Sequence, residues 1–182
     1  MIKICQKYIY FLFFGREGDY IFASRKNCLI TVASKMTYST LKDIFDHSVR
    51  TYSDRPAFSM INGISLTYGQ FAEAVENTAS MLASSGIRKG DKVAIFSGST
   101  PWWPVAYFAC VNYGITAVPI LPDFNGGEAE TLMEHCEAKA LFASARHISN
   151  ISTEFLSKLN IVMDTADLSV VGRSVDNGPS AL

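Results

Sequence analysis

The fold is decided by residues 92–121, KVAIFSGSTPWWPVAYFACVNYGITAVPIL, in which two strand patterns lie on either side of one helix pattern. Residues 93–96 are a short continuous apolar run, which is typical of a strand buried on both faces of a parallel sheet. Residues 116–121 form a second run that is rich in β-branched side chains. The stretch therefore predicts a strand, a crossing helix and a second strand parallel to the first.

Particular residues mark the ends of the helix between these strands. Thr100 can cap the helix, and Pro101 suits its first turn because an N–H at that position would have no partner inside the helix. The helix should run to about Asn112, and Gly114 can end it by taking a left-handed backbone conformation.

The same alternation continues towards the C-terminus. Apolar spacing predicts helices over about 128–137 and 147–159 and strands over 140–143 and 161–163. Alternation at these lengths implies right-handed crossovers and a largely parallel sheet with helices on both faces. The fold class is therefore α/β, and the residues after Asp164 are expected to be irregular, with no closing element.

Two further elements are predicted before residue 68. Ser39 or Thr40 can cap a helix that ends near Ser53 and carries an apolar stripe made of Leu41, Ile44, Phe45 and Val49. Residues 57–61 and 64–67 are short β-type runs around Asn62-Gly63, a pair that accepts the positive φ of a tight turn. A β-hairpin should therefore follow the helix.

A capping box marks the helix after the hairpin. Thr67 and Gln70 have the spacing at which a hydroxyl and a side-chain amide satisfy free backbone groups at a helix start. Gly86 can supply the left-handed stop. The buried stripe of this helix should consist of Phe71, Ala72, Val75, Ala79 and Leu82.

Composition limits the classes of protein to consider. The chain has 182 residues, is 48% hydrophobic and has a net charge of -1. It therefore has enough apolar residues for one domain core, and it lacks the composition of disordered, collagen-like or coiled-coil proteins. The balanced charge gives no uniform field that would attract nucleic acid, so no nucleic-acid partner is expected.

Residues 1–35 differ from the rest of the chain in charge, because they contain six Lys or Arg residues and only two acidic residues, Glu17 and Asp19. The apolar run 8–14 is too short to cross a bilayer, which takes about 20 residues, so no integral membrane segment is expected. We therefore expect a leader outside the domain at 1–35, a partial domain at 36–163 and an irregular truncated tail at 164–182. Translation beginning at Met36 is a hypothesis that follows from the same composition break.

The four cysteines form no metal or redox motif. Cys5, Cys28, Cys110 and Cys136 lie far apart, without a CxxC pair or a histidine at ligand spacing. Cys110 and Cys136 should lie on the buried faces of helices, where cysteine acts as a small apolar residue. A reducing, cytoplasmic location fits this usage.

Few residues could carry chemistry. The loop Ser97-Gly98-Ser99-Thr100 joins a strand to a helix start and could hold a phosphate, but the same residue types are expected for helix capping alone. Trp102 and Trp103 could line an acyl channel or pack in the core. Three histidines are expected at the surface, and three glutamates on one helix face are expected to be solvated: His47, His135, His147, Glu130, Glu134 and Glu137.

Three segments in order carry a family resemblance: Leu66-Thr67-Tyr68, then GIRKGDKVAI at 86–95, then FACVNYGITAVP at 108–119. Together they resemble the N-terminal region of the AMP-forming acyl-CoA synthetases of the adenylate-forming family. The segment Pro101-Trp102-Trp103-Pro104 looks most like the fatty-acid-activating branch. The resemblance covers about residues 41–144.

This resemblance implies the N-terminal subdomain of the adenylate-forming fold and a two-step ligase reaction. A carboxylate, here a fatty acid, would attack the α-phosphate of Mg-ATP to give an acyl-adenylate, and the thiol of CoA would then displace AMP. The implied cofactors are ATP, Mg²⁺ and CoA, and the implied partner is a small-molecule carboxylic acid. Peripheral contact with a membrane stays open.

One departure from the family affects function. The family's phosphate loop, of the form YTSGTTGxPKG, and the segment with its catalytic lysine do not occur in residues 1–182. We therefore assign no catalytic, cofactor-binding or metal-binding residue and expect a fragment that is inactive alone. The alternatives are a stand-alone nucleotide-binding module using the loop at 97–100, a non-catalytic module completed by a partner, and a non-functional remnant.

Overall fold

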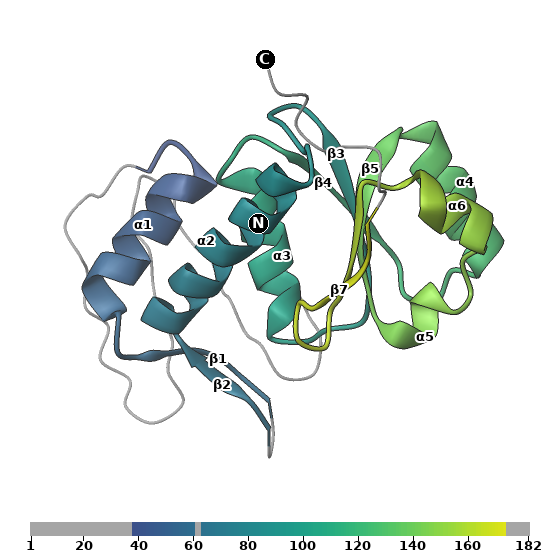
Figure 1. Ribbon diagram of the computed structural model, residues 1–182. Coiled ribbons are helices and arrows are strands. Elements are labelled where there is room, and N and C mark those ends of the chain that lie inside the picture. Colours follow the sequence, from purple (N-terminus) through teal and green to yellow (C-terminus); the bar gives the residue numbers. More distant parts are fainter. Residues whose placement is uncertain (1–37, 61–62, 174–182) are drawn as a thin grey trace, which may run out of the picture. The chain divides into compact units, whose positions relative to one another are not determined.

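A five-stranded sheet with helices on both faces organises the larger part of the chain (Figure 1). The computed structural model describes residues 38–60 and 63–173. The predictions for residues 1–35, for Asn62 in the hairpin turn and for residues 174–182 lie outside this range. The chain divides into two units, residues 1–44 and 45–182, and only residues 38–44 of the first unit are described.

Helix α1 (Leu41–Tyr52) begins directly after Thr40, one of the two residues predicted to cap it. Thr40 Oγ1 accepts a hydrogen bond from the Asp43 amide at 3.1 Å, and Asp43 Oδ2 accepts from the Thr40 amide at 2.9 Å. Because the hydrogen bonds with Thr40 favour the charged carboxylate, they hold the pKa of Asp43 below its ordinary value. In the predicted stripe Phe45 is buried, whereas Leu41 is 47% exposed.

The predicted hairpin is present as strands β1 (Pro56–Ser59) and β2 (Ser65–Thr67), which pair antiparallel. Thr67 then caps α2 (Tyr68–Ser84): its hydroxyl accepts from the Gln70 amide, and the Gln70 side chain accepts from the Thr67 amide. The capping box and the left-handed stop at Gly86, with φ +82°, are confirmed.

The predicted buried stripe of α2 is confirmed except at one position. Ala72 is partly exposed, and Thr78 is buried instead. The Thr78 hydroxyl donates to the Ala74 carbonyl at 2.7 Å, and this bond lets a polar side chain occupy the core.

The sheet has the strand order β4-β3-β5-β6-β7. Its strands are β3 (Lys92–Phe96), β4 (Thr116–Ile120), β5 (Ala138–Ala143), β6 (Ile161–Asp164) and β7 (Val170–Arg173). The first four are parallel, and β7 runs antiparallel to β6. The largely parallel α/β sheet is therefore confirmed.

Strand β7 corrects one expectation, because residues 170–173 belong to the stretch predicted to be irregular. A tight turn makes this strand possible: the Asp164 amide donates to the Ser169 carbonyl at 2.9 Å, and Leu168 adopts a φ of +62°. A four-residue strand after a leucine in this unusual conformation gives little signal in sequence.

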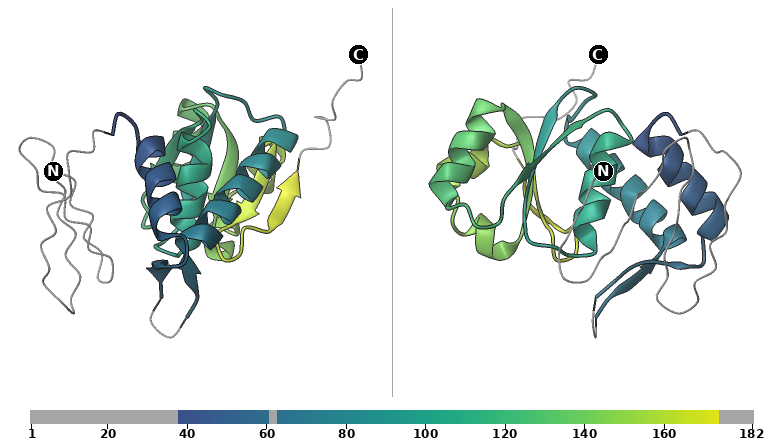
Figure 2. Two further views of the ribbon diagram at one scale, coloured as in Figure 1. Left: turned by 90° about the vertical axis from the view of Figure 1, so that its left-hand side faces the viewer. Right: turned by 180° about the vertical axis from the view of Figure 1, so that it is seen from behind.

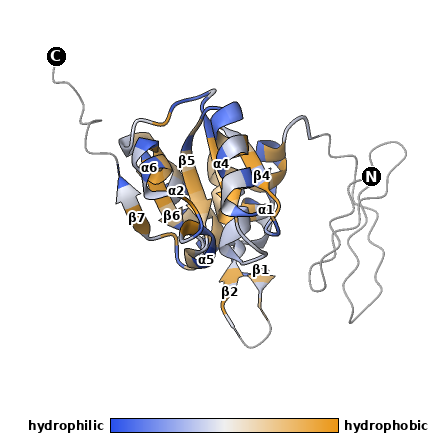
Figure 3. Cartoon of the chain, turned by 90° about the vertical axis from the view of Figure 1, so that its right-hand side faces the viewer, coloured by the Kyte–Doolittle hydropathy of each residue, from blue (hydrophilic) through white to orange (hydrophobic). Residues whose placement is uncertain are grey.

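Helices cover both faces of the sheet (Figure 2). Helices α2 and α3 (Trp102–Val111) pack on one face, and α4 (Gly126–His135), α5 (Ala145–Ile148) and α6 (Thr153–Lys158) lie on the other. Val93 and Ile95 of β3 face the first core, and Ala94 and Phe96 face the second, with 0% exposure at all four. Strand β3 is thus buried on both faces, and its neighbour β5 is coloured mostly as hydrophobic in Figure 3.

Two helices differ from their predicted bounds. Helix α4 begins at Gly126 rather than near Glu128, because Asn125 forms a capping box with Glu128. The helix predicted over 147–159 is two short helices, since Ser152 starts α6 by accepting a hydrogen bond from the Phe155 amide at 3.2 Å.

The start of α3 also differs from the prediction. Thr100 does not cap this helix, because its hydroxyl donates instead to the Thr165 carbonyl at 3.2 Å. The cap position is held by Pro101, which makes no side-chain capping bond. Gly114, with φ +72°, follows the end of the helix as predicted.

Candidate functional site

The carboxyl edge of the parallel strands gathers the polar side chains that could act on a ligand. The loop after β3 leads to α3 on one face of the sheet, and the loop after the neighbouring strand β5 leads to α5 on the other. In an open α/β sheet, ligands bind where adjacent crossovers part in this way. Ser97, Ser144 and Thr165 directly follow β3, β5 and β6 at this edge.

The loop 97–100 is held by the residue that follows β6. Ser97 Oγ lies 2.7 Å from Thr165 Oγ1, and both side chains are buried. Thr100 bonds the backbone of the same residue. Two of the loop's hydroxyl groups therefore tie β3 to β6, and neither caps α3. Sequence reasoning missed Thr165, whose position immediately after a buried strand was the available signal.

Gly98 is the open position of this loop. A Cβ atom built on it would have no other atom within 4 Å. The loop backbone at Gly98 can therefore be approached closely from outside, which is the property that the phosphate-cradle interpretation requires.

The prediction that His147 lies at the surface is wrong. Its side chain is 7% exposed, and its ring centroid lies 4.2 Å from that of Phe96. Nδ1 lies 2.7 Å from Ser144 Oγ, and Nε2 lies 3.0 Å from the carbonyl oxygen of Pro122. His135 is exposed, as predicted, and His47 is half-exposed.

Trp102 and Trp103 pack against the apolar core. Both contact the core between the sheet and α2, and Trp103 stacks on Tyr107 with ring centroids 5.5 Å apart. Trp102 Nε1 is buried and has no hydrogen-bond partner among the described residues. The geometry favours the core interpretation over an acyl channel for both side chains.

The prediction of solvated glutamates is confirmed for Glu134 and Glu137, whose side chains are 62% and 85% exposed, whereas Glu130 is partly buried. All three also have partners. Glu130 accepts hydrogen bonds from the amide and the hydroxyl of Ser152. Glu134 lies 3.9 Å from Lys158, and Glu137 lies 3.5 Å from Lys92. These carboxylates thus connect elements of the fold, and within residues 38–60 and 63–173 no group of three or more His, Cys, Asp or Glu side chains is placed to hold a metal ion.

The two described cysteines differ in environment. Cys110 is completely buried in α3, and burial raises the pKa of its thiol to about 12. Cys136 is only partly buried, because it occupies the C-cap of α4 rather than its inner face. The prediction of a buried helix face is therefore confirmed for Cys110 alone.

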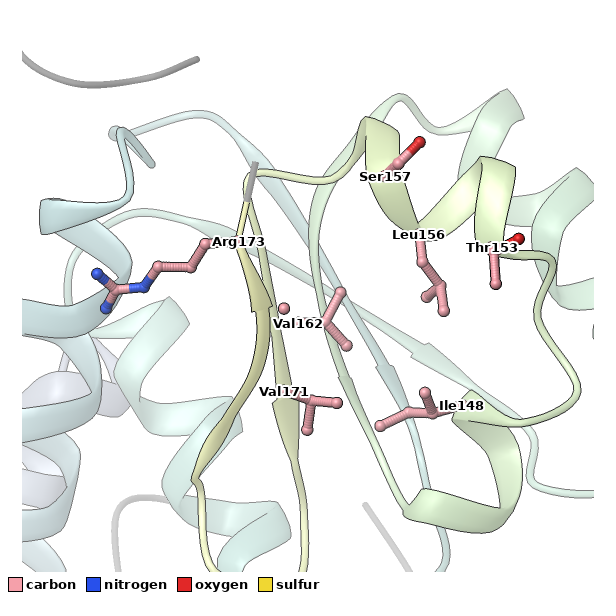
Figure 4. A pocket seen from close by; sticks show the side chains of 8 residues that line it. Ile148, Thr153, Leu156, Ser157, Val162, Val171 and Arg173 are labelled. Carbon is pink, nitrogen blue, oxygen red and sulfur yellow. The ribbon is translucent and has the colours of Figure 1, made fainter. Parts of the chain in front are cut away.

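An apolar cavity of about 240 Å³ lies between α6, strand β6 and the edge strand β7 (Figure 4). The side chains of Ile148, Leu156, Val162 and Val171 point into it, whereas the Arg173 side chain points away on the other side of β7. The residues that line the cavity are distant in sequence from the loop 97–100. The cavity was not predicted because strand β7, which forms one of its walls, was not predicted.

Comparison with known proteins identifies the family. Residues 45–180 match the family model described as AMP-binding enzyme. The chain belongs to the AMP-binding enzyme family. The family resemblance seen in the sequence is thereby confirmed.

Relatives of this AMP-binding enzyme chain are ligases with different substrates. The medium-chain fatty-acid–CoA ligase of Escherichia coli K12 is 31% identical over 108 residues, which are 58% of the chain and 19% of the relative. The L-proline–[L-prolyl-carrier protein] ligase of Streptomyces coelicolor is 31% identical over 109 residues, with the same two shares. The chain thus spans about a fifth of the length of these relatives.

A solved structure shows the same fold. The coronafacic acid ligase of Pectobacterium brasiliense has a TM-score of 0.63 at 22% identity, over 68% of this chain and 25% of the ligase chain. The chain therefore has the architecture of part of the N-terminal subdomain of adenylate-forming enzymes.

Several side chains that could hold the ATP and Mg²⁺ implied by the AMP-binding family are engaged within the fold, whereas the loop backbone at Gly98 stays open to a phosphate. The hydroxyls of Ser97 and Thr100 are bonded to Thr165, and the carboxylates of α4 are engaged with Ser152 and Lys158. Neither group is therefore assigned a site on residues 38–60 or 63–173.

Proposed function

We propose that this chain is the front portion of an AMP-forming acid–thiol ligase. Such an enzyme joins a carboxylate to AMP with release of pyrophosphate, and a thiol then displaces AMP. The match of residues 45–180 to the AMP-binding enzyme family supports the proposal. In the proposed ligase, this chain forms a sheet covered by helices, and the sites for ATP, Mg²⁺ and CoA lie in other parts of the enzyme.

The chain alone is inactive in this proposal. Adenylyl transfer depends on groups that position the phosphates and neutralise their charge, and such groups supply most of the rate. The only loop of the described residues with the composition of a phosphate site, 97–100, has two of its hydroxyls bonded within the fold. A scaffold without those groups does not transfer AMP.

The proposed substrate is a fatty acid. The relative in Escherichia coli is named for medium-chain fatty acids, and the segment Pro101-Trp102-Trp103-Pro104 resembles the fatty-acid-activating branch of the family. The prolyl ligase among the relatives shows that the same family also accepts an amino acid, which makes the acid a necessary variable of any assay.

The proposed location is the cytoplasm, with peripheral contact to membranes from which fatty acids are drawn. The four separate cysteines support a reducing compartment. Among residues 38–60 and 63–173, no helix is both long and apolar enough to cross a bilayer.

A chimeric ligase tests the proposal. Residues 45–173 would replace the matching segment of the Escherichia coli medium-chain ligase, and ATP–pyrophosphate exchange would be measured with a series of fatty acids and with proline. The expected result is exchange that depends on a fatty acid. The ligase with the segment deleted is the control and should show none.

Two outcomes would contradict the proposal. One is exchange by the isolated chain of 182 residues with any acid, because the chain would then hold the catalytic groups itself. The other is a chimera that is folded by circular dichroism but does not exchange pyrophosphate with any acid in the series.

A stand-alone nucleotide-binding module is the second candidate, favoured by the open approach to Gly98 at the carboxyl edge. Under it, the isolated chain binds ATP saturably in equilibrium dialysis, and Gly98→Asp abolishes binding because a carboxylate repels phosphate. Gly98→Ala is the matched control, since the site has room for a methyl group. Absence of binding by the native chain rejects this candidate.

A further inference from the structure

Ser144 and His147 form a hydroxyl–imidazole pair at the carboxyl edge of the sheet. Ser144 Oγ lies 2.7 Å from His147 Nδ1, and Nε2 lies 3.0 Å from the Pro122 carbonyl oxygen. A carbonyl oxygen can only accept, so Nε2 carries the ring proton. Nδ1 then presents its lone pair to Ser144, whose hydroxyl donates to it.

The imidazole of His147 is held firmly by its contacts, whereas Ser144 is partly exposed to solvent. His147 is 7% exposed and packs its ring against Phe96. Ser144 keeps part of its surface exposed at the end of β5. A base oriented by a third group next to an accessible hydroxyl is the arrangement that activates a nucleophile.

Helix capping does not account for the pair. Ser144 occupies the N-cap position of α5, but its side chain makes no capping hydrogen bond. At three other helix starts, Thr67, Asn125 and Ser152 each accept a hydrogen bond from the amide three residues on. The Ser144 hydroxyl differs from all three because it is directed to an imidazole.

We propose that Ser144 is a nucleophile, activated by His147, towards an acyl group that carries a good leaving group. Ser144 Oγ bonds to the carbonyl carbon while its proton moves to His147 Nδ1. The bond to the leaving group breaks, and the leaving group takes the electron pair. The products are a Ser144 ester and the leaving group, which recovers the proton from His147.

The Pro122 carbonyl has a defined part in this step. Its hydrogen bond with Nε2–H fixes the tautomer that can accept the proton, and it stabilises the positive imidazolium that forms. Pro122 is therefore a positioning group. The step needs neither ATP nor Mg²⁺, so it goes beyond the proposed ligase function and stands or falls separately.

The test uses the full chain and p-nitrophenyl acetate. Release of p-nitrophenolate is followed by absorbance, and acetylated residues are mapped by mass spectrometry. Ser149 is the matched internal control, because it follows the same short helix but its hydroxyl donates to the Arg146 carbonyl. General-base assistance is worth roughly a hundredfold or more, so Ser144 should be acetylated about 100-fold faster than Ser149.

Two variants separate the roles. Ser144→Ala should remove the acetyl group from that peptide and leave the imidazole in place. His147→Gln keeps a donor for the Pro122 carbonyl but supplies no base, and it should slow acetylation of Ser144 about 100-fold. Circular dichroism checks that each variant is folded.

The proposal is overturned if Ser144 and Ser149 of the native chain react at equal rates, or if folded His147→Gln reacts as fast as the native chain. Should His147→Gln fail to fold, the native chain in urea decides the matter. The difference between the two serines must disappear on unfolding, and its persistence would show that the fold does not cause it.

Discussion

Gly126 lies where even one added methyl group should disturb the fold. A Cβ atom at this position would lie 1.7 Å from the backbone oxygen of Asn150. Because the clash is with backbone, the connection between α5 and α6 would have to move. We expect Gly126→Ala to lower the free energy of unfolding by about 3 kcal/mol, measured by urea denaturation.

The next residue is the matched control. Gly127 is also in the first turn of α4, and a Cβ there would meet only the Asn125 side chain, at 3.5 Å. Alanine favours a helix over glycine by roughly 0.5–1 kcal/mol, so Gly127→Ala should be neutral or stabilising. Equal effects of the two substitutions would contradict the close contact with Asn150.

Cys110 should make stability depend on pH in the alkaline range. Burial raises the pKa of its thiol from 9.0 to about 12. Between these values the unfolded chain has lost the thiol proton and the folded chain has kept it, so the free energy of unfolding falls as pH rises above about 9. Urea denaturation from pH 7 to 10.5 should show a steeper loss for the native chain than for Cys110→Ala. Parallel pH curves would contradict the prediction.

At the scale of single elements, the start of α2 is held by the reciprocal bonds of Thr67 and Gln70. Replacing a capping threonine with alanine costs about 1 kcal/mol, and we expect this loss for Thr67→Ala in thermal or urea denaturation. Gln70→Ala should lose less, and the double variant should lose less than the sum of the two. Full additivity would show that the two side chains act independently.

The capping boxes also show which elements a sequence reveals. Thr67 and Gln70 are three residues apart, so both halves of the signal lie in one short window. The break between α5 and α6 lies at Ser152, whose hydroxyl accepts a hydrogen bond from the Phe155 amide and donates to Glu130 in another helix. The cap is a local signal that sequence reasoning missed, whereas the bond to Glu130 joins distant residues and gives no periodicity, so one continuous helix was predicted where two exist.

The two edge strands of the sheet, β4 and β7, differ in how well they are protected against pairing with a strand of another molecule. On β4, Pro119 has no N–H to offer a further strand. On β7, Val170 is 38% exposed and no proline interrupts the strand. We expect Val170→Lys to reduce aggregation, measured by light scattering during heating, because a charge on an edge strand opposes strand addition.

A control separates the edge effect from surface hydrophobicity. Leu121 is 65% exposed just beyond β4, so Leu121→Lys removes as prominent an apolar side chain away from the β7 edge. It should change aggregation much less. Equal effects would mean that exposed apolar area in general, rather than β7, drives association.

At the scale of the whole molecule, the alternation of strands and helices from β3 to β6 and the two covered faces of the sheet were predictable from local patterns. Examples are the apolar run 93–96 and the helix ends at Gly86 and Gly114. The polar contacts of the carboxyl edge were not predictable, because His147 meets Pro122 and Ser97 meets Thr165 only after the strands have paired. A histidine taken for a surface residue is thus buried by a loop 25 positions away.

The central position of β3 has a consequence for synthesis of the protein. Strand β3 is the first strand of the five-stranded sheet to leave the ribosome, yet its two neighbours, β4 and β5, are made later. At about 5–20 residues per second, the chain needs roughly 2–10 s to extend from Phe96 to Ala143. During that time a strand that is buried on both faces of the finished sheet has an unpaired edge, and such an edge exposes the nascent chain to aggregation.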